Sequence, residues 1–167
     1  MTFLKNKFSL IILGIDPGIA DTGFGVIKKD WHNKLACLAY GSIKTKARTE
    51  HSERLYLIYK ELNKIIKKYK PAVIAVEQLF FSSNAKTALI VGEARGVAML
   101  AAGQNKVPAT QFTPLEVKQA VSTYGRAGKD QVQKMVKIIL NLKEIPRPDD
   151  AADALAVAIC AANSRNI

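Results

Sequence analysis

Four carboxylate residues occupy positions at which a charged side chain requires a partner: Asp16, Glu77, Asp150 and Asp153. The first closes the apolar run Leu10–Ile15, and the second closes the apolar run Ala72–Val76. The other two stand three residues apart at the start of an alanine-rich segment, so they share one face of a helix. Because an isolated buried carboxylate is costly, such residues need hydrogen bonds, a cation or a metal ion.

Each of these carboxylates also has an ordinary structural interpretation. Asp16 precedes a Pro-Gly pair, and aspartate is a common first residue of such a turn. Acidic residues at a helix N-terminus stabilise the helix through its dipole, which accounts for Asp149 or Asp150. This explanation covers Asp153 less well, because the apolar run Ala154–Ala161 follows it and predicts a buried helix.

Taken together, the four carboxylates predict a metal-dependent reaction. Carboxylates brought to one point repel one another unless divalent cations are present, and hard cations such as Mg²⁺ take oxygen ligands. In a basic protein, a pair of ions bound by carboxylates indicates phosphodiester hydrolysis, in which one ion generates the attacking hydroxide and the other steadies the leaving oxygen. Nearby lysines would offset the charge that develops on the phosphate.

The carboxylates need a scaffold, and the hydrophobic pattern predicts a mixed α/β sheet of five strands covered by helices. The predicted strands are Leu10–Asp16, Gly23–Lys29, Leu35–Lys44, Ala72–Val76 and Val107–Phe112. The first three follow one another with links of hairpin length, which favours an antiparallel meander. If the first and fourth strands are parallel neighbours, Asp16 and Glu77 end at one edge of the sheet, where the sites of open α/β sheets gather.

Five helices are predicted: Ser52–Tyr69, Asn84–Gly103, Leu115–Ser122, Asp130–Leu140 and a last one that begins at Asp149-Asp150. The first has a clear helical period and a solvated lysine face, and the second is rich in small residues that permit close packing. Thr113 to Glu116 form a helix start, with a threonine cap, a proline at the first position and a capping-box glutamate. The last helix would carry its two aspartates over the strand ends.

A basic, glycine-containing loop, Tyr124–Lys129, opens the fourth helix. Its glycine spacing is too short for a Walker phosphate loop, and Asp130 stands where that motif needs Ser or Thr. Helix N-termini nevertheless favour anions, so we expect this loop, with Arg126, to contact a backbone phosphate.

Composition limits the class of protein and its partners. A chain of 167 residues with 49% hydrophobic residues is most economically one globular domain, with residues 1–9 as a basic lead. The 25 basic against 14 acidic residues give a net charge of +11, which indicates a polyanionic partner, nucleic acid first and an anionic membrane surface second. A merely basic soluble protein would share this charge.

The two cysteines and the lengths of the apolar runs indicate the cellular compartment and whether a membrane span is present. Cys37 and Cys160 are far apart in apolar surroundings, which favours core thiols in a reducing compartment over a zinc site or a disulfide. Asp16 cuts short the apolar run near the N-terminus, so no secretion signal is predicted there, and no stretch reaches the length of a membrane span. We therefore expect a soluble, cytoplasmic protein.

Five stretches of the sequence resemble the RuvC family of crossover junction endodeoxyribonucleases, or Holliday junction resolvases. They are IDPGIADTGFGVI, AVEQLFFSSNAKTALIVGEARGVA, EVKQAV, GRAGKDQVQKMV and PDDAADALAVAI, in the family's order from about Ile11 to Ala162. The resemblance implies a ribonuclease H-like fold and a nuclease that resolves four-way DNA junctions by paired symmetric nicks in recombination and repair. It further implies a homodimer that works with a branch-migration motor.

The resemblance also assigns residue roles. It implies that Asp16, Glu77, Asp150 and Asp153 are the catalytic, metal-binding carboxylates, which would hold two Mg²⁺ ions, with Mn²⁺ as an alternative ion. The family's base-stacking aromatic falls on Phe80, and its DNA-contacting lysines fall on Lys118 and Lys129. Asp149 offers a second carboxylate beside Asp150, and the sequence leaves open which of the two faces the metals.

Three other functions remain open at this point. Asp16 to Gly25 resembles the first phosphate loop of actin-like phosphotransferases, although those proteins need two such domains to hold a nucleotide. A related ribonuclease H-like nuclease could act on RNA. A non-catalytic DNA-binding module would keep the basic surface without needing the carboxylates.

Overall fold

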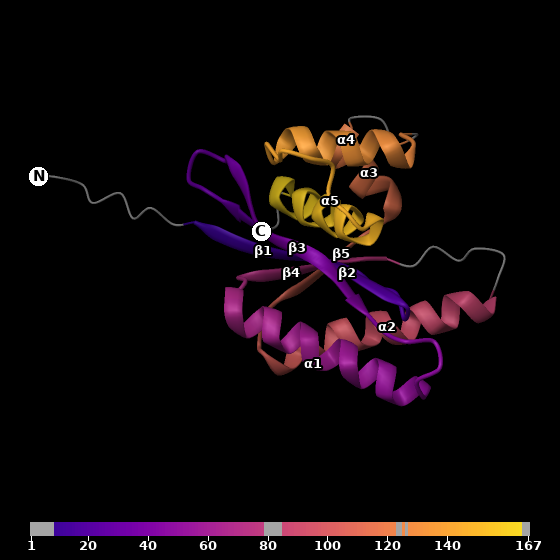
Figure 1. Cartoon of the computed structure of the whole chain (residues 1–167). Coiled ribbons are helices and arrows are strands. Elements are labelled where there is room, and N and C mark those ends of the chain that lie inside the picture. The colour runs from indigo at the N-terminus through magenta and orange to yellow at the C-terminus, as the bar shows by residue number, and fades with distance from the viewer. Residues whose placement is uncertain (1–8, 79–84, 123–124, 126, 165–167) are drawn as a thin grey trace, which may run out of the picture.

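A computed structural model describes residues 9–78, 85–122, 125 and 127–164 (Figure 1). Its strands are β1 (Leu10–Asp16), β2 (Asp21–Lys29), β3 (Leu35–Lys44), β4 (Val73–Glu77) and β5 (Ala109–Phe112). Its helices are α1 (His51–Tyr69), α2 (Ala85–Gln104), α3 (Pro114–Ser122), α4 (Lys129–Ile139) and α5 (Asp149–Asn163). Every predicted strand and helix of the sequence is therefore present, with ends that differ by a few residues.

The five strands form one mixed sheet in the order β3-β2-β1-β4-β5. The first three are an antiparallel meander, while β4 pairs parallel with β1 and β5 pairs parallel with β4. The expected parallel contact between the first and fourth strands is thus confirmed. Because β1 and β4 run side by side in the same direction, their carboxyl ends meet at one edge of the sheet.

Helices cover both faces of the sheet, so the domain has three layers (Figure 1). One face packs against α1 and α2, and the other packs against α3, α4 and α5. Alternate residues of each strand face opposite layers: in β1, Ile12 belongs to the core beneath α5, whereas Leu13 and Ile15 belong to the core beneath α1. Each layer therefore has its own hydrophobic core.

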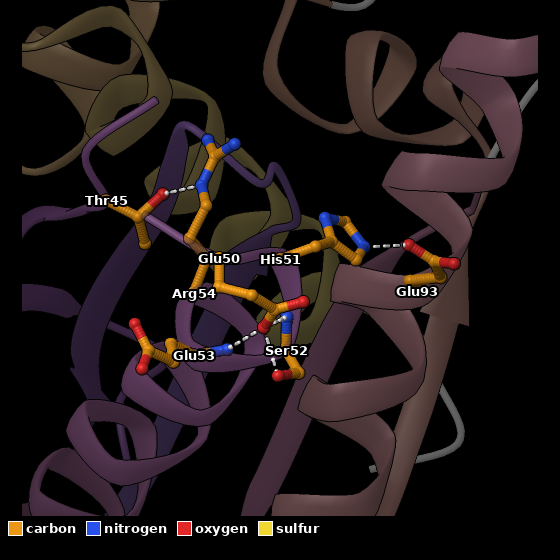
Figure 2. A network of polar contacts seen from close by, with 7 residues as sticks. All are labelled: Thr45, Glu50, His51, Ser52, Glu53, Arg54 and Glu93. Atoms are coloured by element: carbon orange, nitrogen blue, oxygen red, sulfur yellow. Dashed lines mark hydrogen bonds and ion pairs between the residues drawn. The ribbon is translucent and has the colours of Figure 1, made fainter. Parts of the chain in front are cut away.

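Capping side chains fix the starts of two helices, and one of the two caps was predicted from the sequence. Glu50 caps α1, since its carboxylate accepts hydrogen bonds from the backbone of Ser52 at 2.7 Å and Glu53 at 3.2 Å (Figure 2). In α3 the predicted capping box is confirmed: the Glu116 carboxylate accepts from the Thr113 backbone at 2.7 Å, and the Glu116 backbone donates to the Thr113 hydroxyl at 3.2 Å. Each cap satisfies backbone N–H groups that have no partner within the first turn of its helix.

Polar contacts join α1 to its neighbours at the same end of the helix. His51 pairs with Glu93 of α2, and Arg54 Nε donates to the Thr45 hydroxyl at 2.8 Å (Figure 2). The lysines predicted on the solvated face of α1 are exposed. Among the described helices, none combines the length and the apolar character that a membrane span requires.

Candidate active site

The strand-borne half of the site consists of Asp16 and Glu77, which close β1 and β4. Ile15 and Val76 are register partners in the parallel pair, so the next residue of each strand is a carboxylate at the same edge. Alternate residues of a strand lie on the same face of the sheet. Asp16 therefore lies on the face of Ile12, and Glu77 lies on the face of Val73 and Ala75, all of which belong to the core beneath α5. They therefore project toward α5 rather than toward α1.

The helix-borne half lies in the first turn of α5, which begins at Asp149. This helix is deeply buried, because every residue from Ala151 to Ala162 except Asp153 is buried. It crosses β1 and β2 with its N-terminus at the edge where β1 and β4 end. The expected approach of Asp150 and Asp153 to the strand carboxylates is consistent with the electrostatics of Asp16.

Asp16 carries the strongest electrostatic signature of the site. Burial, followed by the negative charges of Glu77, Asp153 and Asp150, raises the pKa of Asp16 from 3.8 to about 8, against the opposing effect of Lys129. A carboxyl group in this position keeps its proton near neutral pH unless a cation arrives. The four carboxylates singled out in the sequence thus act on one another through space.

Glu77 and Asp153 are perturbed in the same direction. Burial, and then the charge of Asp153, raises the pKa of Glu77, whereas a hydrogen bond with Asp16 and the charge of Lys118 lower it. Burial is also the main reason for the raised pKa of Asp153, which Lys129 partly offsets. The carboxylates of the two strands and of α5 therefore raise one another's pKa, and the two lysines oppose this effect.

Two lysines and two carboxylates face one cavity of about 240 Å³. Glu77 and Asp153 lie on one side of it, and Lys118 of α3 and Lys129 of α4 line it with apolar residues of α3 to α5. The two lysines predicted from the resemblance are therefore beside the carboxylates. A cavity with cations around a carboxylate cluster suits a phosphate group bound next to metal ions.

Lys129 forms a bridge between two aspartates of α5. Its Nζ lies 3.3 Å from Asp153 Oδ2 and 3.4 Å from Asp149 Oδ2, while Arg147 Nη1 lies 2.7 Å from Asp149 Oδ1. Although burial lowers the pKa of Lys129, Asp153 and Asp149 raise it above its ordinary value. Hydrogen bonds from Gln133 and Lys129 lower the pKa of Asp149.

Asp149 and Asp150, between which the sequence did not choose a metal ligand, differ in their surroundings. Asp149 engages basic and amide side chains of α4 and the preceding loop, whereas Asp150 contributes to the raised pKa of Asp16. The role of Asp149 as a partner of Lys129 was not predicted from the sequence. Its only signal was a third acidic residue in the PDDAAD stretch, which fitted the helix dipole equally well.

The donor set fits a hard divalent cation in chemistry and charge. All four side chains supply carboxylate oxygens, and the pKa of Asp16 is raised first by burial and then by the negative charges of the other three, which a bound cation would offset. Over the residues that the structure describes, no three Asp, Glu, His or Cys side chains already stand in a metal-binding arrangement. Repulsion between carboxylates opposes such an arrangement until a cation is present.

The other site predictions lie outside the described residues. Phe80 and Arg126 belong to the ranges 79–84 and 126, so their predicted contacts with DNA stay predictions.

One residue next to the site, the buried Thr22, was not predicted from the sequence. Its hydroxyl donates to the Gly18 carbonyl at 2.6 Å and holds the turn that follows Asp16. Threonine in a strand gives no signal of such a role.

Comparisons with known proteins are consistent with this geometry. The family model described as crossover junction endodeoxyribonuclease RuvC matches residues 12–161. A protein of that description from Caldanaerobacter subterraneus subsp. tengcongensis is 53% identical over 93% of this chain and 94% of its own length. Another from Ruminiclostridium cellulolyticum is 55% identical over 95% of both chains.

Solved structures with the same fold include Thermus thermophilus RuvC in complex with a Holliday junction substrate. It has a TM-score of 0.86 and 37% sequence identity, and the match covers 90% of this chain and 92% of that one. The yeast mitochondrial Holliday junction resolvase has a TM-score of 0.67 at 16% identity, which shows a shared fold.

Proposed function

The chain belongs to the RuvC family of crossover junction endodeoxyribonucleases, and from this membership we propose that it resolves four-way DNA junctions by paired symmetric nicks. The observation that carries the proposal is the pKa of Asp16, raised to about 8 by burial and by three further carboxylates. Such a cluster beside Lys118 and Lys129 suits the hydrolysis of a phosphodiester, whose charge increases toward the transition state.

Asp16, Glu77, Asp150 and Asp153 would hold the metal, which we take to be two Mg²⁺ ions per site. When bound, divalent ions lower the pKa of a water molecule and stabilise charge on the phosphate. The protein would supply oxygen ligands from two strands and one helix, whose backbones are held by the sheet edge and by the buried α5. Asp16 and Glu77 are half-buried, so their carboxylates are partly shielded from bulk water.

The lysines and the adjoining loops would bind the DNA. Lys118 and Lys129 line the cavity and would contact the phosphates next to the scissile bond. Phe80 follows β4 by three residues and would stack on a base at the open junction, as aromatic side chains do on unpaired bases. Arg126, in the basic loop before α4, would contact a backbone phosphate.

Paired nicks require two sites, and we propose that α2 forms the homodimer contact. Leu89 and Leu100 are 71% and 63% exposed and lie eleven residues apart, which places them on one face of the helix three turns from each other. Gly96 lies between them, and nothing occupies the space where its side chain would be. A branch-migration motor is the further partner that family membership suggests.

One cleavage assay tests the substrate and the chemistry together. A synthetic four-way junction, a linear duplex of the same sequence and an RNA hairpin are incubated with the protein, with and without Mg²⁺. We expect symmetric nicks in the junction alone and only with the metal. Cleavage of the hairpin alone would instead identify an RNA nuclease.

An Asp16→Asn variant separates the nuclease from a DNA-binding module. Junction binding should survive this change, because the basic residues are intact, while cleavage is lost. Cleavage that persisted in the variant would contradict the assignment of the four carboxylates.

A further inference from the structure

Gly23 lies where the two halves of the proposed site meet. It belongs to β2 and is the register partner of Asp16 in the antiparallel pair. On the same face, Gly25 pairs with Gly14 of β1. These three glycines form the part of the sheet on which α5 rests.

The backbone of Asp150 lies directly against Gly23. A Cβ atom built on Gly23 would be 2.0 Å from the carbonyl oxygen of Asp150, 2.4 Å from its carbonyl carbon and 3.1 Å from its Cβ. A separation of 3.4 Å or more is ordinary contact, so the first turn of α5 could not keep its place above a larger residue. Because the clashing atoms are backbone, no side-chain rotation relieves the conflict.

The same close contact continues along α5. An added Cβ would lie 2.1 Å from the Ala154 carbonyl oxygen at Gly14, and 2.7 to 2.8 Å from Leu155 atoms at Gly25. Gly41 of β3 is different, because its added Cβ would meet only the Phe24 ring, which is the end of a side chain. Gly23 is distinguished from the others by contacting a residue of the proposed site itself.

We propose that Gly23 is a positioning residue for the metal site, an inference that rests on the proposed function. By admitting the Asp150 backbone against β2, it sets the separation between the strand carboxylates, Asp16 and Glu77, and the helix carboxylates. Catalytic and metal-binding groups need to be held within about 0.5 Å of their working positions. An added Cβ would lie 2.0 Å from the Asp150 carbonyl oxygen, so the helix would have to move away to restore an ordinary contact of 3.4 Å. That movement exceeds the tolerance.

The test measures Mn²⁺ binding to the free Gly23→Ala protein by calorimetry, beside cleavage of the four-way junction and junction binding in EDTA. We expect metal affinity to fall about 10- to 100-fold, as for residues that orient metal ligands, and kcat to fall about 10²-fold, as for a misplacement of 1 Å. Junction binding in EDTA should stay unchanged, since no basic residue is altered.

Two control variants isolate positioning from loss of stability. Ile159→Ala removes buried contacts of α5 nine residues beyond Asp150, and should lower the thermal midpoint without changing Mn²⁺ affinity. Gly41→Ala replaces a strand glycine that faces a side chain and should leave both unchanged. The proposal is overturned if Gly23→Ala keeps the wild-type Mn²⁺ affinity, or loses no more affinity than Ile159→Ala.

If Gly23→Ala does not fold, Gly25→Ala provides the same test one step further from the site. Its Cβ would press on Leu155 and lift α5 beyond the first turn, so the Mn²⁺ affinity should fall by a smaller factor that still exceeds that of Ile159→Ala. Equal affinities in these two variants would overturn the proposal. A wild-type protein that binds Mn²⁺ without cleaving the junction would instead contradict the proposed function and leave the Gly23 test valid.

Discussion

At the scale of single residues, the site is a balance between burial and charge. Asp16 and Glu77 are costly to ionise because they are buried beside other carboxylates, and Lys129 supplies only part of the missing positive charge. A metal ion would supply the rest. Groups arranged in this way weaken the folded protein while no metal is bound, which is a common cost of active sites.

The pKa of Asp16 leads to a pH dependence of stability. The pKa of Asp16 is about 8 in the folded state against 3.8 ordinarily, so between these values the unfolded state releases the proton while the folded state keeps it, and the contribution of Asp16 to stability falls as pH rises. In EDTA, the free energy of unfolding should therefore fall as pH rises from about 4 to about 8. Urea unfolding at both ends of the window checks this.

Asp16→Asn should weaken that fall and stabilise the metal-free protein at pH 8 by roughly 1–2 kcal/mol. Asp130→Asn, at an exposed position of α4, is the control and should leave the dependence intact. If the Asp16 variant showed the same loss of stability as the wild type, the proton would have to lie elsewhere.

The adjacent aspartates of α5 should differ in their effect on cleavage. Asp150→Asn should lower kcat on the order of 10²-fold or more, because it removes a proposed metal ligand. Asp149→Asn should keep most of kcat, since Asp149 engages Lys129 and Arg147 instead. Single-turnover cleavage of a junction at saturating Mg²⁺ compares them. A larger loss in Asp149→Asn would reverse the assignment.

At the scale of elements, local sequence accounts for most of what is observed. The capping box of Thr113 and Glu116 predicted the start of α3, and the helical period of Ser52–Tyr69 predicted α1, in which Ile58 and Leu62 are buried. The ends of β4 and β5 were less well predicted, because β pairing extends β4 to Glu77 and begins β5 only at Ala109. The strands that pair with β4 are distant from it in the sequence, so the local pattern of residues does not include them.

At the scale of the whole molecule, the proposed homodimer contact depends on the exposed leucines of α2. Single exposed apolar side chains are common, but Leu89 and Leu100 share one helix face with Gly96, which permits close approach of another helix. Two copies joined there would present two carboxylate clusters to one junction. The geometry of the dimer would then decide which strands are cut.

Leu89→Glu and Leu100→Glu, separately or together, should dissociate the homodimer, because a desolvated charge opposes association. Light scattering after size exclusion measures the oligomeric state, and junction cleavage should change from paired to unpaired nicks. Ile138→Glu on α4, where the side chain is 67% exposed, is the matched control. Variants of α2 that stayed dimeric would show that another surface forms the contact.

The sequence by itself determined the order of elements and the capping box of α3, and it predicted the four carboxylates, because each of these depends on residue type and on spacing along the chain. It also carried the family resemblance that later comparison with relatives confirmed. Only the tertiary structure decided that Asp149 turns to Lys129 and that Gly23 carries the backbone of Asp150. The first depends on how α5 packs against α4 and the second on how α5 packs against β2, and both contacts join elements that are far apart in the sequence.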